Sequence, residues 1–135
     1  MREVRTAHRN VDLRMDASGD LVGDWDADRL AQVVSNLLGN AIQHGQGSPV
    51  TLTARDEDDS VTLAVHNGGA PISAEALPFV FEPLARGTTD NAGHSIGLGL
   101  FIARAIVSAH EGQIDVTSSS DAGTTFTVRL LKDLA

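Results

Sequence analysis

The sequence contains no cysteine, which excludes disulfides and thiolate metal sites and agrees with a reducing cytoplasm. It also lacks an apolar run long enough to cross a bilayer, and its first ten residues, MREVRTAHRN, lack the apolar segment of a signal peptide. It has 10 Lys and Arg but 18 Asp and Glu, and the resulting net charge of −8 argues against nucleic-acid capture by the whole surface. If the protein binds phosphates, it must therefore do so locally, by backbone amides, helix N-termini or a bridging cation.

The chain does have enough residues for one core, 135 with 41% apolar side chains. Residues 11–15 and about 20–23 predict two short strands joined by a tight turn at Ser18-Gly19. A helix is expected from Asp26, a suitable N-cap, to about His44. Its apolar residues recur at steps of three and four: Leu30, Val33, Val34, Leu37, Leu38, Ala41 and Ile42.

The middle of the chain predicts a hairpin and a long loop. Alternating apolar residues in 50–54 and 61–65 indicate two strands, with turn-like residues 56–60 between them. A short helix is expected from Ser73 to Phe81. Residues 85–96 are polar and aperiodic, and loops of such length are often functional lids.

The last third predicts a second long helix, about 97–111, followed by strands near 113–119 and 123–131. One face of that helix is expected to be apolar: Leu98, Ile102, Ala105, Ile106 and Ala109. Helices combined with a mixed, mostly antiparallel sheet predict an α+β fold, a two-layer α/β sandwich.

Four polar residues of the first helix share one stripe, because Gln32, Asn36, Asn40 and His44 are each four residues apart. Asparagine is a weak helix former, so its repetition here has a cost. One interpretation is a solvated face. The other is a row facing a ligand, with an amide oxygen offered to a hard cation.

Two glycine-bearing turns are a second feature. In VTLAVHNGGAPI a strand ends at Asn67, followed by Gly68 and Gly69, which allow a close backbone approach to a ligand. In HSIGLGLFIAR, Gly97 and Gly99 stand at a helix start, where free N–H groups favour phosphate. Close helix packing is the alternative explanation for the second pair.

Together and in this order, these segments resemble the catalytic ATP-binding domain of sensor histidine kinases. That family shares the Bergerat fold with gyrases, mismatch-repair ATPases and certain heat-shock chaperones. DADRLAQVVSNLLGNAIQHG resembles the N box, VHNGGAPI the first glycine box and FVFEPLARG the F box. GLGLFIARAIVSAHEGQI resembles the second glycine box and GTTFTV the last. The five boxes span nearly the whole chain.

The resemblance implies ATP and Mg²⁺ as cofactors, with Asn40 and Asn36 at the metal and with Asn36 and Arg86 in catalysis. Asn40 would be a direct Mg²⁺ ligand, and Asn36 would assist it from the preceding turn. ATP-hydrolysing relatives carry a catalytic Glu at the position of Asn36, and asparagine cannot act as that base. This favours transfer to a protein acceptor over hydrolysis. Arg86 would bring positive charge to the γ-phosphate as the lid closes.

The resemblance also implies a set of nucleotide-binding residues. His44 would lie near adenine, Gln43 stands where a Lys is frequent, and Thr125 would lie at the adenine end. The turn that holds the phosphates would include Gly97, Gly99 and Leu100. The full set is Asn36, Asn40, Gln43, His44, Asn67, Gly69, Ile72, Gly97, Leu98, Gly99, Leu100 and Thr125.

The first glycine box departs from the family pattern Asp-x-Gly-x-Gly. Asn67 replaces the Asp that accepts a hydrogen bond from the adenine amino group, so the acceptor is neutral. A charged acceptor is worth about 1–2 kcal/mol more, which corresponds to roughly tenfold in affinity. Pro71 also stiffens the turn.

A complete histidine kinase also needs a phosphoaccepting histidine on a dimeric helical hairpin. None of the chain's five histidines stands in such a context. We therefore expect residues 1–135 to form a single catalytic domain that does not autophosphorylate in isolation. Its acceptor hairpin would lie elsewhere, in the same protein or another, with a response regulator downstream. We expect no nucleic-acid or membrane contact and a cytoplasmic location.

Two other functions stay open. A serine kinase of the anti-sigma-factor kind has similar boxes and size, and only the histidine-kinase hypothesis predicts a phosphohistidine. A non-catalytic nucleotide-sensing module would bind Mg·ATP without labelling any acceptor domain.

Overall fold

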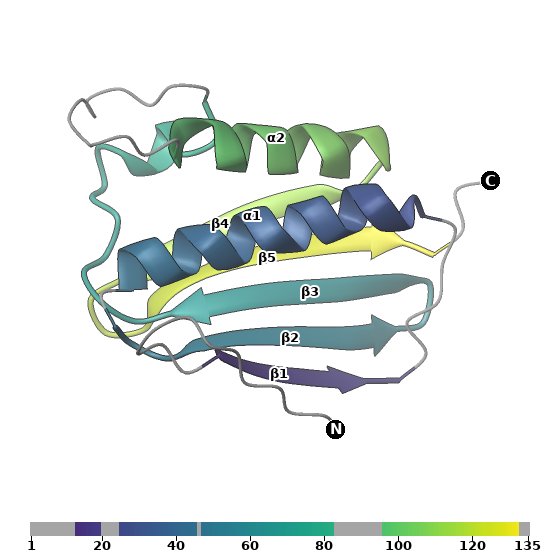
Figure 1. The fold of residues 1–135 in the computed structure, drawn as a ribbon, viewed down its shortest axis with the longest axis horizontal. Helices are drawn as coiled ribbons and strands as arrows, with labels where there is room; N and C mark the ends of the chain where they lie inside the picture. The colour runs from purple at the N-terminus through teal and green to yellow at the C-terminus, as the bar shows by residue number, and fades with distance from the viewer. Residues whose placement is uncertain (1–12, 20–24, 46, 83–95, 133–135) are drawn as a thin grey trace.

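A five-stranded sheet carries two helices on one of its faces in the computed structural model, which describes residues 13–19, 25–45, 47–82 and 96–132 (Figure 1). The elements are β1 (Leu13–Ser18), α1 (Ala27–Gly45), β2 (Val50–Glu57), β3 (Ser60–Asn67), a 3₁₀ turn η1 (Leu77–Phe79), α2 (Ile96–Ala109), β4 (Gln113–Ser119) and β5 (Gly123–Leu131). The strand order is β1-β2-β3-β5-β4, with β1 parallel to β2 and the other pairs antiparallel. The predicted α+β sandwich is confirmed.

Helix α1 begins at the predicted cap. Asp26 Oδ1 accepts hydrogen bonds from the N–H groups of Asp28 and Arg29, at 3.1 and 3.2 Å, as an N-cap should. The apolar face is also as predicted: Val33, Leu37 and Ala41 are buried, and Leu30, Val34, Leu38 and Ile42 pack against the core. The helix ends at Gly45.

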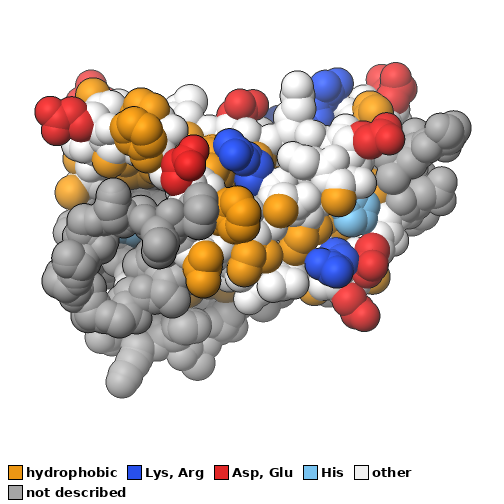
Figure 2. All heavy atoms as spheres, turned by 90° about the horizontal axis from the view of Figure 1, so that it is seen from above, with side chains coloured by type: hydrophobic (Ala, Val, Ile, Leu, Met, Phe, Trp, Pro, Cys, Tyr) orange, Lys and Arg blue, Asp and Glu red, His pale blue; other side chains and the backbone are white. Residues whose placement is uncertain are grey.

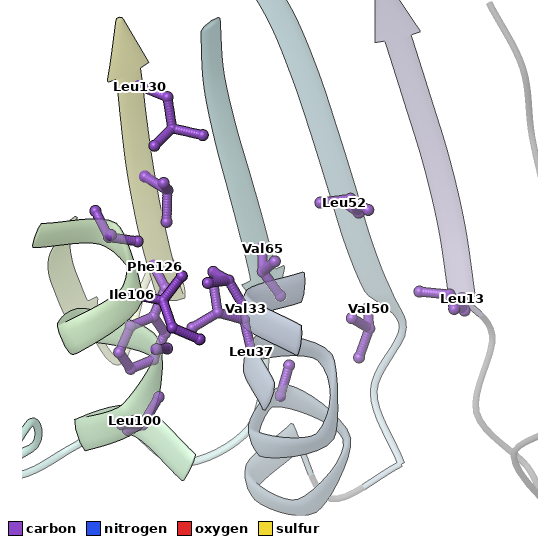
Figure 3. Packing of buried hydrophobic residues seen from close by; sticks show 14 residues of the cluster. Leu13, Val33, Leu37, Val50, Leu52, Val65, Leu100, Ile106, Phe126 and Leu130 are labelled. Carbon is purple, nitrogen blue, oxygen red and sulfur yellow. The ribbon is translucent and has the colours of Figure 1, made fainter. Parts of the chain in front are cut away.

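The core lies between the helices and the sheet (Figure 3). Its largest fully buried side chain is Phe126 of β5, and Phe81 meets its ring edge to face, with centroids 5.9 Å apart. Val65 of β3 stands opposite Phe126 in the strand register. Side chains along β5 therefore alternate between the face that packs against the helices and the opposite face. This alternation places Thr124, and not Thr125, on the same face as Phe126.

The predicted apolar face of α2 is only partly right: Ile106 is buried and Ile102 packs against the core, but the other three predicted residues do not. Its buried residues are Leu100, Ala103, Ile106 and Val107, and of these only Ile106 was predicted. Leu98 is 48% exposed, and Ala105 and Ala109 are also exposed. Figure 2, which looks onto the side where α2 lies, shows hydrophobic side chains gathered in the middle of that face. Because IGLGLFIARAIVSA is apolar almost all round, its periodicity does not single out one face.

Two other local predictions need correction. Residues 73–81 form turns and the short 3₁₀ turn η1 instead of an α-helix, because Pro78 lacks the N–H that an α-helix needs. Ser73 does cap the segment: its Oγ accepts the Ala76 N–H at 3.1 Å. The predicted β2–β3 turn is shorter than expected, since only residues 58–59 separate the strands.

Some predicted segments lie outside the described residues, namely the strand at 20–23 and most of the lid at 85–96. Residue 18, expected in a turn, belongs to β1, which pairs with β2. None of the helices in the described ranges is long and apolar enough to cross a membrane.

Candidate functional site

A cleft of about 220 Å³ lies between α1 and the beginning of α2. Its lining residues are Ser35, Asn36, Gly39, Asn40, Gln43, Gly99 and Leu100. Five of these were predicted as site residues from two segments about sixty positions apart, and the fold brings them together. Gln32, on the same predicted stripe, is exposed and does not line the cleft. The stripe is therefore partly a solvated face and partly the wall of a cleft.

Asn36 joins the two sides of this cleft. Its Nδ2 donates a hydrogen bond to Gly99 O at 3.1 Å, and a Cβ on Gly99 would lie 4.0 Å from the Asn36 side chain. This is an ordinary van der Waals distance, so packing against Asn36 does not by itself require glycine at position 99. Gly97 and Gly99 also lie in the first turn of α2, where the backbone N–H groups have no partner within the helix. This end of the cleft therefore offers donors suited to phosphate oxygens.

The donor set of the cleft decides how a metal ion would be held. Asn36 and Asn40 offer neutral amide oxygens, which are hard donors of the kind that Mg²⁺ accepts. Within the described ranges, no group of three His, Cys, Asp or Glu side chains is arranged to hold a metal. These residues fit a cation that arrives with its own anionic ligands, because Mg²⁺ is usually bound together with substrate phosphates.

The second part of the candidate site is at the end of β3. Asn67 is 1% exposed, and its Nδ2 donates to Gly68 O at 2.6 Å. Its Oδ1 is buried and has no hydrogen-bond partner among the described residues. Leaving a buried carbonyl oxygen unpaired costs about 1–3 kcal/mol, so this oxygen is suited to accept a hydrogen bond from a ligand.

The strand register places Thr124, and not the predicted Thr125, beside Asn67. Thr124 pairs with Asn67 and is buried, whereas Thr125 pairs with His66 on the opposite face of the sheet. The Thr124 hydroxyl lies 2.7 Å from Ser118 Oγ, which also accepts the Ile72 N–H at 2.8 Å. Thr124 and Ser118 were not predicted, although the alternation along the last strand, counted from buried Phe126, places Thr124 on the buried face.

Gly69 and His44 meet where the loop after β3 passes the end of α1. Gly69 has a φ of +91°, and a Cβ there would lie 2.9 Å from Gly45 O and 3.0 Å from His44 O. The His44 side chain keeps exposed surface, yet partial burial lowers its pKa below the usual 6.5. The lowered pKa favours the neutral imidazole.

The lowered pKa of His44 predicts a pH dependence of stability. As the pH falls through 6.5, the unfolded chain binds a proton at His44 before the folded chain does, so the free energy of unfolding should fall. Replacing His44 with Gln should make this loss smaller in urea unfolding at pH 7.5, 6.5 and 5.5, because the other histidines are common to both proteins. Equal pH dependence in the two proteins would contradict the assignment.

Two further predicted residues are not brought into the cleft. Leu98 does not line it, and Arg86 lies outside the described residues with the lid. The candidate site therefore consists of the cleft between the helices, with Asn36 and Asn40, and the buried pair Asn67 and Thr124 on β3 and β5. Asn67 is buried beside Gly45, the last residue of α1, so this helix contacts both parts.

Comparison with known proteins agrees with this geometry. Residues 25–134 match the family described as histidine kinase-, DNA gyrase B-, and HSP90-like ATPase. The chain is 32% identical over 126 residues to the sensor histidine kinase component HK1 of Mycobacterium tuberculosis, covering 93% of this chain and 74% of that protein. It is 47% identical over 111 residues to the probable sensor histidine kinase TcrY of the same organism, covering 80% of this chain and 23% of that protein.

Solved structures show the same fold. The catalytic domain of the histidine kinase ThkA superposes with a TM-score of 0.80 at 31% identity, over 93% of this chain and 81% of that one. ThkA has also been solved in complex with the response regulator protein TrrA, where the TM-score is 0.73 at 28% identity, over 93% and 35% of the two chains. The chain spans less than two thirds of most of the curated relatives that it matches.

The relatives named above are sensor histidine kinases, so the serine-kinase alternative is not favoured. The family match covers both parts of the candidate site, and the solved catalytic domain shares the arrangement of sheet and helices. The chain belongs to the histidine kinase-, DNA gyrase B- and HSP90-like ATPase family and is an ATP-binding catalytic domain of the sensor histidine kinase type.

Proposed function

We propose that this domain binds Mg·ATP between α1 and α2 and transfers the γ-phosphoryl group to a histidine on a separate helical-hairpin domain. One observation carries the choice of acceptor. None of the described residues that line the cleft is Asp, Glu or His. Hydrolysis needs a side chain that takes a proton from the attacking water, and an amide such as Asn36 cannot take it.

In the proposed reaction, a nitrogen of the acceptor imidazole bonds to the γ-phosphorus while the bond from phosphorus to the bridging oxygen breaks, which releases ADP. An imidazole nitrogen attacks with its own lone pair, so this chain need not supply a base. Its residues would act by positioning: first-turn N–H groups of α2 on the phosphates, and Asn36 and Asn40 on Mg²⁺. The bound cation supplies charge neutralisation at the phosphates.

The other assigned residues complete the proposal. Asn67 and Thr124 would contact the base, with Gly69, Ile72 and His44 beside them. Gln43 would line the phosphate side, and Arg86 would approach the γ-phosphate from the lid. We place the domain in a cytoplasmic two-component pathway, upstream of a response regulator.

Because the amide donors are neutral, Mg²⁺ alone should not bind measurably to this chain. Titration of MgCl₂ into the nucleotide-free protein should give no calorimetric signal at millimolar concentration, whereas the same titration with ATP present should give heat beyond that of MgCl₂ with ATP alone. Saturable Mg²⁺ binding without nucleotide would contradict the proposed donor set.

The neutral acceptor Asn67 predicts that Asn67→Asp binds ATP about tenfold more tightly, since a charged acceptor forms the stronger hydrogen bond. Calorimetric titration of both proteins with Mg·ATP measures the difference. Asp115→Asn, an exposed position on β4, is the control for a change of one charge and should leave the affinity unchanged. Equal or weaker binding by Asn67→Asp would contradict the role of Asn67 as the acceptor.

Phosphoryl transfer can be tested in a chimaera in which this chain replaces the corresponding part of TcrY. Incubation with Mg·[γ-³²P]ATP should label the hairpin with an acid-labile, base-stable phosphoryl group. The same chimaera with Asn40→Ala is the negative control, and TcrY itself is the positive one. A chimaera that binds ATP normally but stays unlabelled would favour the non-catalytic alternative.

A further inference from the structure

Two serine hydroxyls hold the loop that follows β3, residues 68–72. The Gly68 N–H donates to Ser48 Oγ at 3.0 Å, and the Ile72 N–H donates to Ser118 Oγ at 2.8 Å. Ser48 lies between α1 and β2, and Ser118 lies on β4. The two ends of the loop are therefore fixed to two different parts of the fold.

The anchor at Ser118 extends to a buried residue of β5. Its Oγ lies 2.7 Å from Thr124 Oγ1, and Thr124 stands opposite Asn67 in the sheet. Ser118 thus accepts one hydrogen bond from the loop and shares another with a buried strand residue. Buried polar groups linked in this way rigidify their surroundings.

The anchor at Ser48 controls the orientation of the Asn67 amide. Asn67 Nδ2 donates to the carbonyl oxygen of Gly68, whose N–H is held by Ser48. With Nδ2 engaged, Oδ1 is the atom that stays unpaired and buried. If the Gly68 backbone were released, glycine's wide conformational range would let this carbonyl turn away, and the amide would lose the bond that orients it.

We propose that Ser48 and Ser118 are positioning residues for nucleotide selectivity, an inference that rests on the proposed ATP site. They hold the loop so that Asn67 presents a carbonyl oxygen, and not an amino group, to the base. A carbonyl oxygen accepts from the exocyclic amino group of adenine. A reversed amide would instead donate, as the carbonyl oxygen of guanine requires.

The test compares Ser48→Ala and Ser118→Ala with the natural chain in calorimetric titrations with Mg·ATP and Mg·GTP. Each variant should bind ATP about three- to tenfold more weakly, the range expected for one lost hydrogen bond. The ATP-to-GTP affinity ratio should fall with it. Ser118→Thr keeps the hydroxyl and should restore the ratio, while Ser120→Ala, exposed in the β4–β5 turn, should change nothing.

Amide hydrogen exchange on the nucleotide-free proteins gives a second measurement. Exchange at Gly68 should accelerate in Ser48→Ala, and exchange at Ile72 should accelerate in Ser118→Ala. An unchanged ATP-to-GTP ratio in both alanine variants would overturn the proposal, even if their melting temperatures fell, since that pattern indicates a purely structural role. If the natural chain bound no ATP, the proposed function would fail as well. Because the natural chain is titrated beside the variants, this failure is distinguishable from a failure of the positioning role alone.

Discussion

Replacing Asn40 with alanine is expected to remove most of the Mg²⁺-dependent affinity for ATP. Asn40 is half-buried, lines the cleft and stands one turn from Asn36 on α1. Mutations of residues that only support a metal ligand commonly cost 10- to 100-fold in affinity, so loss of a direct ligand should cost about 100-fold. Titration with ATP in Mg²⁺ and in EDTA measures this effect, because only the affinity in Mg²⁺ should fall.

Gln32→Ala is the matched control for this substitution. Gln32 lies on the same stripe of α1, two turns before Asn40, but it is exposed and outside the cleft. Its loss should leave the affinity for Mg·ATP and the unfolding midpoint unchanged. If Asn40→Ala bound Mg·ATP as tightly as Gln32→Ala does, Asn40 would not be the metal ligand.

The second large effect is expected at Gly123, the first residue of β5. Its φ is +80°, and a Cβ would lie 2.5 Å from Asn67 O and 2.9 Å from His66 Nε2. The His66 ring can turn aside, but the backbone of Asn67 cannot move without displacing its side chain. Gly123→Ala should therefore lower the free energy of unfolding by about 3 kcal/mol, combining left-handed strain with overpacking, and should weaken ATP binding.

Gly47→Ala separates the two contributions. Gly47 has a similar φ of +87°, but no described atom lies within 4 Å of the Cβ it would carry. This variant should lose only about 1 kcal/mol in urea unfolding and keep its affinity for ATP. If Gly47→Ala and Gly123→Ala lost equal stability, the contact with Asn67 would contribute nothing.

The fold follows from local signals that agree with one another. Asp26 caps α1, the apolar steps of α1 face the core, and Gly123 begins β5 at a positive φ. Each of these depends on residues close together in the chain, which is why the pattern alone predicts them. The pairing of β1 with β2 could not be predicted in this way, because it joins strands that are separated in the sequence by the whole of α1.

The buried face of α2 and the pairing of Thr124 with Asn67 could not be read from spacing. Almost every residue of α2 is apolar, so the buried face is chosen by contact with α1 and the sheet. Thr124 and Thr125 are adjacent and chemically identical. Only the register that sets Phe126 opposite Val65 decides that Thr124 faces Asn67, because a shift of one residue exchanges the faces of a strand.

The candidate site was predicted where one helix supplies several residues, and missed where distant strands meet. Asn36, Asn40 and Gln43 share a wall of the cleft because they follow one another on α1. The Ser118 anchor instead joins β4, β5 and a loop, which no periodicity links. The unpaired Oδ1 of Asn67 likewise becomes visible only when its surroundings are known.

We propose that this domain holds ATP through Asn40 at the phosphates and Asn67 at the base. Calorimetric titration of the natural chain with Mg·ATP and with Mg·GTP tests it most directly. We predict saturable binding of ATP at one site and binding of GTP at least about tenfold weaker, because a single acceptor oxygen faces the base. Equal affinities for the two nucleotides, or no binding of either, would contradict the account.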